Sequence, residues 1–191
     1  MQMNSSPQAV LAIAPGKREL GIAVFVGADL VYFAVKTIRN RRASNLLQKE
    51  VDGILRKLFR NFSVKTVITK SISRYQKLSS DLESIAEHIK SESRKRDLRV
   101  REISLEQIKS VFGQNRKITQ KKAFETLLTF YPQLRRYWHR PNKWQNDYYA
   151  FLFSAVAVGA VYVKTFSDRN QRENHFTKSG VSSDTAAAPE F

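Results

Sequence analysis

The sequence predicts an α/β domain built on a mixed five-stranded sheet flanked by helices, and three observations lead to that prediction. Three apolar segments come first, separated by spacers so short that neighbours should pair antiparallel. Two more strand patterns then alternate with helical patterns, which favours parallel additions through right-handed crossovers. The 191 residues, 42% of them hydrophobic, suffice for one buried core. We expect one domain at residues 9–166, with disordered tails at 1–8 and 167–191.

The strands are predicted from short runs of β-branched and aromatic residues. The first three cover residues 9–14, 20–26 and 30–37, and the first ends at the Pro15-Gly16 turn. Residues 64–69 form an apolar run typical of a buried strand. Residues 98–103 alternate apolar and charged side chains, which indicates a half-buried strand.

The helices are predicted from apolar residues at helical spacing and from capping residues. They should begin near Ser44, Ser80, Ser104 and Thr119, with a last helix over about Asp147 to Lys164. Ser104 and Gln107 form a capping-box pattern, and Pro132 ends the helix that follows Thr119. The last helix is apolar around most of its circumference, so we expect it to be buried on more than one side.

The net charge of +16 is concentrated in two stretches of the chain. Residues 36–60 carry eight basic and two acidic side chains, and residues 109–143 carry nine basic and one acidic. Such stretches are typical of a surface that binds a polyanion, and nucleic acid is the expected partner. No basic segment also has a strongly apolar face, so a membrane partner is not expected.

Several classes of protein are disfavoured by composition. The chain has no cysteine, which excludes disulfides and thiolate metal sites. His88, His139 and His175 are far apart in the sequence and show no ligand spacing, so no zinc site is expected. No apolar run approaches a bilayer-spanning length, and residues 1–8 lack signal-peptide features. We expect an intracellular, cytoplasmic protein.

Five segments carry a resemblance to a known family. They are Leu-Ala-Ile-Ala-Pro-Gly at 11–16, Gly-Ile-Ala-Val at 21–24, Val-Lys-Thr-Val-Ile-Thr at 64–69, Thr-Gln-Lys-Lys-Ala at 119–123 and Phe-Ser-Ala-Val-Ala-Val-Gly at 153–159. In this order they resemble the RuvC-like Holliday-junction resolvases of the RNase H-like superfamily. The resemblance covers about residues 9 to 163, and it implies an RNase H-like fold.

The resemblance also implies a chemistry, two-metal hydrolysis of phosphodiesters, for which carboxylates hold two Mg²⁺ ions. The family aspartate of the first strand falls at Ala14. The central-strand glutamate falls at Thr69, or at Lys70 if the alignment shifts by one residue. The aspartate of the last helix falls at Ser154, and a further acid falls near Phe151. None of these side chains can replace a carboxylate, so we expect a catalytically inactive protein without a metal cofactor.

Two alternatives stay open. One is an active endonuclease dependent on Mg²⁺ or Mn²⁺, with displaced acids such as Asp147, which lies two helical turns before Ser154. A single-metal site on Asp147 is a variant of that alternative, whereas its simpler interpretation is a favourable acid near a helix N-terminus. The other alternative is a protein-interaction scaffold within a nucleic-acid complex.

Basic residues near the equivalent cleft are the expected nucleic-acid contacts, and they follow strand ends or surround the start of the Thr119 helix. They are Lys17, Arg18, Lys70, Arg74, Lys77, Arg116, Lys117, Lys121 and Lys122. The resemblance favours structured or branched DNA over RNA and allows a homodimer.

Overall fold

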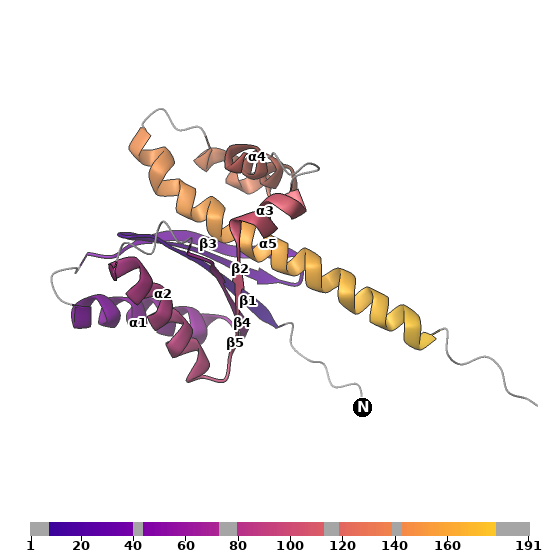
Figure 1. Cartoon of the computed structure of the whole chain (residues 1–191), viewed down its shortest axis with the longest axis horizontal. Helices are drawn as coiled ribbons and strands as arrows, with labels where there is room; N and C mark the ends of the chain where they lie inside the picture. Colours follow the sequence, from indigo (N-terminus) through magenta and orange to yellow (C-terminus); the bar gives the residue numbers. More distant parts are fainter. Residues whose placement is uncertain (1–7, 40–43, 73–79, 113–118, 139–142, 179–191) are drawn as a thin grey trace, which may run out of the picture.

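The computed structural model describes residues 8–39, 44–72, 80–112, 119–138 and 143–178. Its strands are β1 (Ala9–Pro15), β2 (Glu19–Val26), β3 (Asp29–Thr37), β4 (Val64–Lys70) and β5 (Arg99–Ile103). They form one sheet in the order β3-β2-β1-β4-β5 (Figure 1). The pairs β1/β2 and β2/β3 are antiparallel, and β1/β4 and β4/β5 are parallel. The predicted mixed five-stranded sheet is confirmed.

The first three strands form a meander because the spacers between them are tight turns. Gly16 N donates to the carbonyl of Glu19 at 2.7 Å, which closes the turn between β1 and β2. Gly27, between β2 and β3, has a φ of 59°, a left-handed conformation that favours glycine. These turns fix the order β3-β2-β1, and β4 then pairs in parallel with the other side of β1, the central strand.

Helices α1 (Ser44–Asn61) and α2 (Ser80–Arg94) cover one face of the sheet (Figure 1). Their apolar stripes pack on alternate residues of β1, including Leu11 and Ile13, in one buried cluster. In α1, Val51 and Leu55 are core residues at 0% and 1% exposure, whereas Leu46, which the helical spacing also predicts to be in the core, is 43% exposed.

The opposite face is covered by α3 (Leu105–Phe112), α4 (Gln120–Phe130), the 3₁₀ helix η1 (Pro132–Tyr137) and α5 (Lys143–Lys178) (Figure 1). The capping box predicted for α3 is present, since Gln107 N donates to Ser104 Oγ and Ser104 N donates to Gln107 Oε1. The η1 turn was not predicted, although Pro132 at its first position suits a helix start.

Helix α5 contacts every strand of the sheet and lies unusually close to β1 and β2. A Cβ atom on Gly21 would lie 1.9 Å from the carbonyl oxygen of Phe151, and one on Gly159 would lie 2.2 Å from the Phe25 ring. Small side chains make this approach feasible, because Ala12 and Ala14 belong to the same buried cluster as the helix.

Helix α5 is longer than predicted. It begins at Lys143 rather than near Asp147 and continues to Lys178, beyond the end at about Lys164 that the apolar pattern predicts. No glycine or proline stands between Gly159 and Gly180, so this part of α5 contains neither of the two residues least compatible with a helix. Residues 1–7 and 179–191 lie outside the described part, and the domain boundaries stay a prediction.

The segment Gln145–Thr165 of α5 is long and apolar enough to cross a membrane by length and composition alone. However, 61% of its most apolar stretch is buried inside the fold. Packing on the sheet and on α3 and α4 accounts for its apolar character, as predicted for a helix buried on more than one side.

Candidate nucleic-acid interface

The carboxyl ends of β1 and β4 meet at the centre of one edge of the sheet. The two strands are parallel, and Ile13 is the partner of Thr69 in their register. Ala14, one residue further along β1, is fully buried in the cluster that includes α5. This edge is where the resemblance implies a metal site.

The face of the sheet to which each β4 side chain points decides which of them lies beside Ala14. Val67 packs in the α1/α2 cluster and Ile68 in the α5 cluster. Successive strand residues point to opposite faces, so Lys70 shares the face of Ala14, and Thr69 points toward α1 and α2. The sequence leaves Thr69 and Lys70 open as the equivalent of the central-strand glutamate, and the structure favours Lys70. The Thr69 hydroxyl is buried and has no hydrogen-bond partner among the described residues.

Helix α5 places an aromatic ring and a small polar side chain at this edge. A Cβ atom on Gly16 would lie 2.4 Å from the ring of Phe151, so that ring lies against the turn after β1. Ser154 follows almost one turn later and is buried, with 4% of its surface exposed. The positions singled out by the resemblance therefore carry a methyl group, a phenyl ring, a hydroxyl and an ammonium group.

Lys70 is the charged group at the end of β4, and its side chain is half-buried. Burial lowers the pKa of its ammonium group from the ordinary value. No ion-pair partner for it occurs within the described ranges. A partly desolvated cation without a counter-charge is unfavourable, so an anion bound at this edge would be stabilised.

Of the other predicted nucleic-acid contacts, some are exposed in the described structure and the rest lie outside the described residues. Lys17 and Arg18 are exposed in the turn between β1 and β2, and Lys121 and Lys122 are exposed in the first turn of α4. The predicted Thr119 cap of α4 is present, since Lys122 N donates to Thr119 Oγ1 at 3.3 Å. Arg74, Lys77, Arg116 and Lys117 lie outside the described residues.

The two basic stretches of the sequence do not form one surface in the described structure. Lys49 and Lys57 are exposed on α1, which covers one face of the sheet, whereas Lys121 and Lys122 lie on α4 over the other face. Lys70 and Ala14 point to the α4 side. The α4 side is therefore the candidate interface.

A cavity with a volume of about 380 Å³, which the sequence did not predict, lies on this side. It is lined by residues of α4, of η1 and the Trp138 that follows it, and of α5, namely Lys121, Phe124, Tyr137, Trp138, Asn146, Asp147, Ala150 and Phe153. Asp147, the candidate displaced acid, is exposed there. The interleaving of aromatic and basic residues over 131–144 was the signal in the sequence that could have indicated it.

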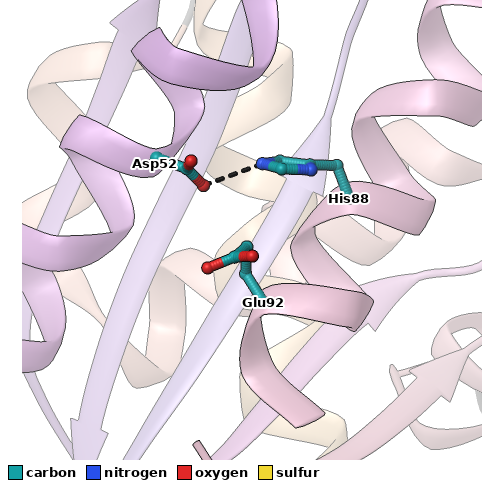
Figure 2. A group of neighbouring side chains, drawn as sticks. All are labelled: Asp52, His88 and Glu92. Carbon is teal, nitrogen blue, oxygen red and sulfur yellow. Dashed lines mark hydrogen bonds and ion pairs between the residues drawn. The ribbon is translucent and has the colours of Figure 1, made fainter. Parts of the chain in front are cut away.

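A second unpredicted cluster lies between α1 and α2, on the opposite face of the sheet. Asp52, His88 and Glu92 form the group of potential metal ligands found within the described residues, with ligand atoms within 4.8 Å of one another (Figure 2). His88 Nε2 lies 2.7 Å from Asp52 Oδ1. His88 and Glu92 are four residues apart on one helix, a spacing visible in the sequence, but Asp52 reaches them only through the fold.

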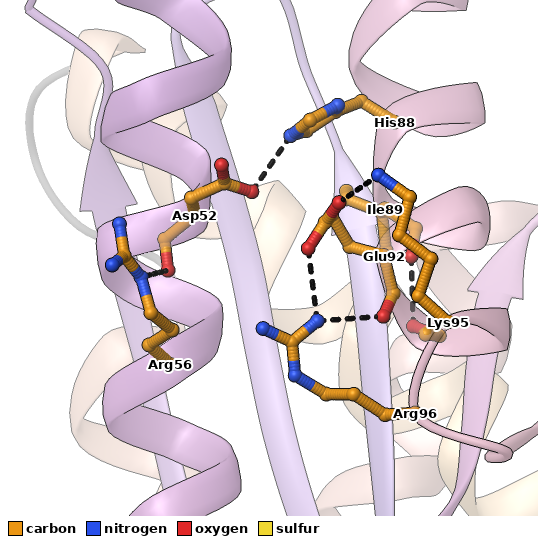
Figure 3. Close-up of polar contacts among 8 residues, drawn as sticks. Asp52, Arg56, His88, Ile89, Glu92, Lys95 and Arg96 are labelled. Atoms are coloured by element: carbon orange, nitrogen blue, oxygen red, sulfur yellow. Dashed lines mark hydrogen bonds and ion pairs between the residues drawn. The ribbon is translucent and has the colours of Figure 1, made fainter.

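Basic side chains surround this cluster (Figure 3). Lys95 Nζ lies 2.7 Å from Glu92 Oε1, and Arg96 Nη1 lies 2.9 Å from Glu92 Oε2. Arg56 donates to the backbone carbonyl of Asp52 at 3.4 Å. With both Glu92 oxygens bound and three cations nearby, the group is better suited to a polar contact between two helices than to a divalent metal.

These ion pairs predict a pH dependence of stability. Hydrogen bonds from Arg96 and Lys95 lower the pKa of Glu92 from 4.5 to about 2. The folded-state pKa is the lower one, so the contribution is present above about pH 4.5 and is lost as the pH falls toward 2.

Replacing Glu92 with glutamine should reduce the free energy of unfolding at neutral pH by about 1 kcal/mol, because the cations are partly solvated. The difference from the unchanged protein should shrink on acidification, as measured by urea unfolding at several pH values. Glu83→Gln, at an exposed position on the same helix, is the control. A Glu92→Gln difference that stays constant down to pH 3 would contradict this account.

Only the comparison with solved structures finds proteins that resemble this chain. No family model matches the chain, and no curated protein matches it in sequence. Among solved structures, Thermus thermophilus RuvC in complex with a Holliday junction substrate matches with a TM-score of 0.63 and 12% identity, over 81% of this chain and 92% of that chain. The yeast mitochondrial Holliday junction resolvase Ydc2 matches with a TM-score of 0.60 and 9% identity, over 89% and 85%. The chain therefore has the RuvC-like RNase H fold.

Proposed function

We propose that this chain is a nucleic-acid-binding domain of RuvC-like fold that does not cleave its ligand, and that structured or branched DNA is the ligand. The observation that carries the proposal is the edge where β1 and β4 end. A fully buried methyl group, Ala14, and a half-buried ammonium group, Lys70, face the same side there.

These residues do not fit the metal ions that the resemblance implies. Mg²⁺ requires hard oxygen donors, usually carboxylates, at short distance. Ala14 offers none, Lys70 repels a cation, and the ring of Phe151 lies against the adjoining turn. The described residues hold no group of three metal ligands at this edge.

The same residues fit a phosphate group. In an enzyme of this kind, metal ions offset the repulsion between carboxylates and the phosphate backbone. Here the lysine itself carries the positive charge, and a phosphate would supply the counter-charge that Lys70 lacks among the described residues. Phosphate binding is also supported by two exposed lysines on the same side, Lys121 and Lys122, and by the net charge of +16.

DNA is favoured over RNA because a structural neighbour, Thermus thermophilus RuvC, was solved with a Holliday junction substrate. A homodimer, and an intracellular, cytoplasmic location, stay predictions from the sequence.

An active nuclease that uses Asp147 is the rival function, since this acid is exposed in the cavity beside Lys121.

Binding can be tested by fluorescence anisotropy with a labelled four-way junction, in the presence of a chelator. Affinity should persist without metal and should fall about a hundredfold between about 50 and about 200 mM salt, as expected for several phosphate contacts. Lys70→Gln should reduce the affinity, whereas Lys65→Gln, at an exposed position earlier on the same strand, should have little effect. Absence of binding at physiological salt would refute the proposal and favour a protein-interaction scaffold.

A further inference from the structure

The cavity between α4, η1 and α5 combines aromatic walls with polar groups at its rim. Its volume of about 380 Å³ lies within the range of pockets that hold small ligands. Tyr137 and Trp138 are half-buried and line the cavity together with the buried Phe153. Asn146, Asp147 and Lys121 are exposed.

The aromatic residues are held in place by other rings. Trp138 packs edge-to-face on Phe153 at 4.8 Å between centroids and on Phe124 at 6.2 Å. Tyr137 contacts Phe33 at 5.9 Å and Tyr149 at 4.9 Å. Because these contacts fix both side chains before any ligand arrives, stacking on them costs little ordering.

We propose that this cavity receives an unpaired base of the bound nucleic acid, an inference that rests on the proposed function. Aromatic side chains stack on any base, and only a base outside a duplex exposes its flat face. The Asn146 amide can donate and accept hydrogen bonds, and the Asp147 carboxylate accepts them from the amino groups on the Watson–Crick edge.

Charge supports a nucleic acid rather than an apolar peptide as the occupant. Lys121 stands at the rim in the first turn of α4, where backbone N–H groups add partial positive charge. It can contact the phosphate that flanks an inserted base. Asp147 would repel a phosphate, which favours the base rather than the backbone beside it.

The inference can be tested with three labelled probes: a fully paired duplex, the same duplex with one unpaired guanine, and the same duplex with one unpaired thymine. The guanine probe should bind about tenfold more tightly than the paired duplex, because stacking adds to the phosphate contacts. The thymine probe should fall between them, since its Watson–Crick edge offers the carboxylate fewer donors than that of guanine.

Variants separate the roles of the lining residues. Asp147→Asn should abolish the preference for guanine over thymine, because the amide can no longer act only as an acceptor for the guanine donors. The exposed Asp81 on α2, changed to asparagine, is the matched control and should retain the preference. In a Trp144→Phe background, where Trp138 is the only tryptophan, its fluorescence should be quenched by the guanine probe and not by the paired duplex.

The outcomes distinguish this inference from the proposed function. Salt-dependent binding of all probes with equal affinity, and with no change in Trp138 fluorescence, would overturn the base site and leave nucleic-acid binding intact. Binding of none of the probes would overturn both. Loss of guanine preference in the Asp81→Asn control would also overturn the assignment to this cavity.

Discussion

Replacing Gly21 with alanine is expected to destabilise the fold by about 3 kcal/mol or more, at the upper end of overpacking effects. The new methyl group would lie 1.9 Å from the carbonyl oxygen of Phe151 and 2.3 Å from its carbonyl carbon. These are backbone atoms of a helix that contacts every strand, so relief requires the helix to move. Urea unfolding followed by circular dichroism measures the change.

Gly53 provides the matched control for this prediction. It lies inside α1, and a Cβ atom there would meet no atom within 4 Å. The same substitution at Gly53 should stabilise the protein by about 0.5–1 kcal/mol, because alanine is the better helix former. Equal effects of the two substitutions would contradict the close packing of α5 on β2.

Reversing the charge of Lys121 and Lys122 together should lower the affinity for a four-way junction about a hundredfold at low salt. Both residues are exposed in the first turn of α4, on the face of the sheet to which Lys70 points. Two phosphate contacts are lost and two repulsive groups are introduced, so the slope of affinity against salt should also become shallower.

The matched control is the double change of Lys49 and Lys57 to glutamate on α1. It alters the net charge by the same amount, but these exposed lysines lie on the other face of the sheet. The account expects a much smaller loss of affinity, due only to the overall field of the protein. A larger loss from the α1 change would place the interface on the α1/α2 face.

The three antiparallel strands and the later buried strand could be predicted from the sequence because each had a local cause. Pro15 and Gly16 mark the first turn and Gly27 the second, and the run of residues 64–69 has the length and composition of a buried strand. The helix starts at Ser104 and Thr119 were equally local, since their capping side chains act within three residues.

The choice between Thr69 and Lys70 could not be made from the sequence. The residues before them, Val67 and Ile68, are both buried, so no alternation of polar and apolar residues shows which face each occupies. The pairing of β1 with β4 also contains a register shift between Ala9 and Val10, which spacing alone does not show. Only the packing of the neighbouring residues settles the faces.

Contacts between distant segments were likewise beyond the sequence. Asp52 and His88 are 36 residues apart and meet because α1 and α2 pack side by side. The two basic stretches are separated because their helices cover opposite faces of the sheet. Helical periodicity in the sequence does not show which face a helix covers. The cavity beside Trp138 depends on three helical segments converging, and only its composition was visible in advance.

The most direct test of the central claim is incubation of the purified protein with a labelled four-way junction in Mg²⁺ and in Mn²⁺, followed by denaturing electrophoresis. The account predicts a junction that is bound but intact in both metals, with an affinity that a chelator does not change. Strand cleavage that requires the metal and disappears in Asp147→Asn would contradict it, because the acid would then serve an active nuclease site.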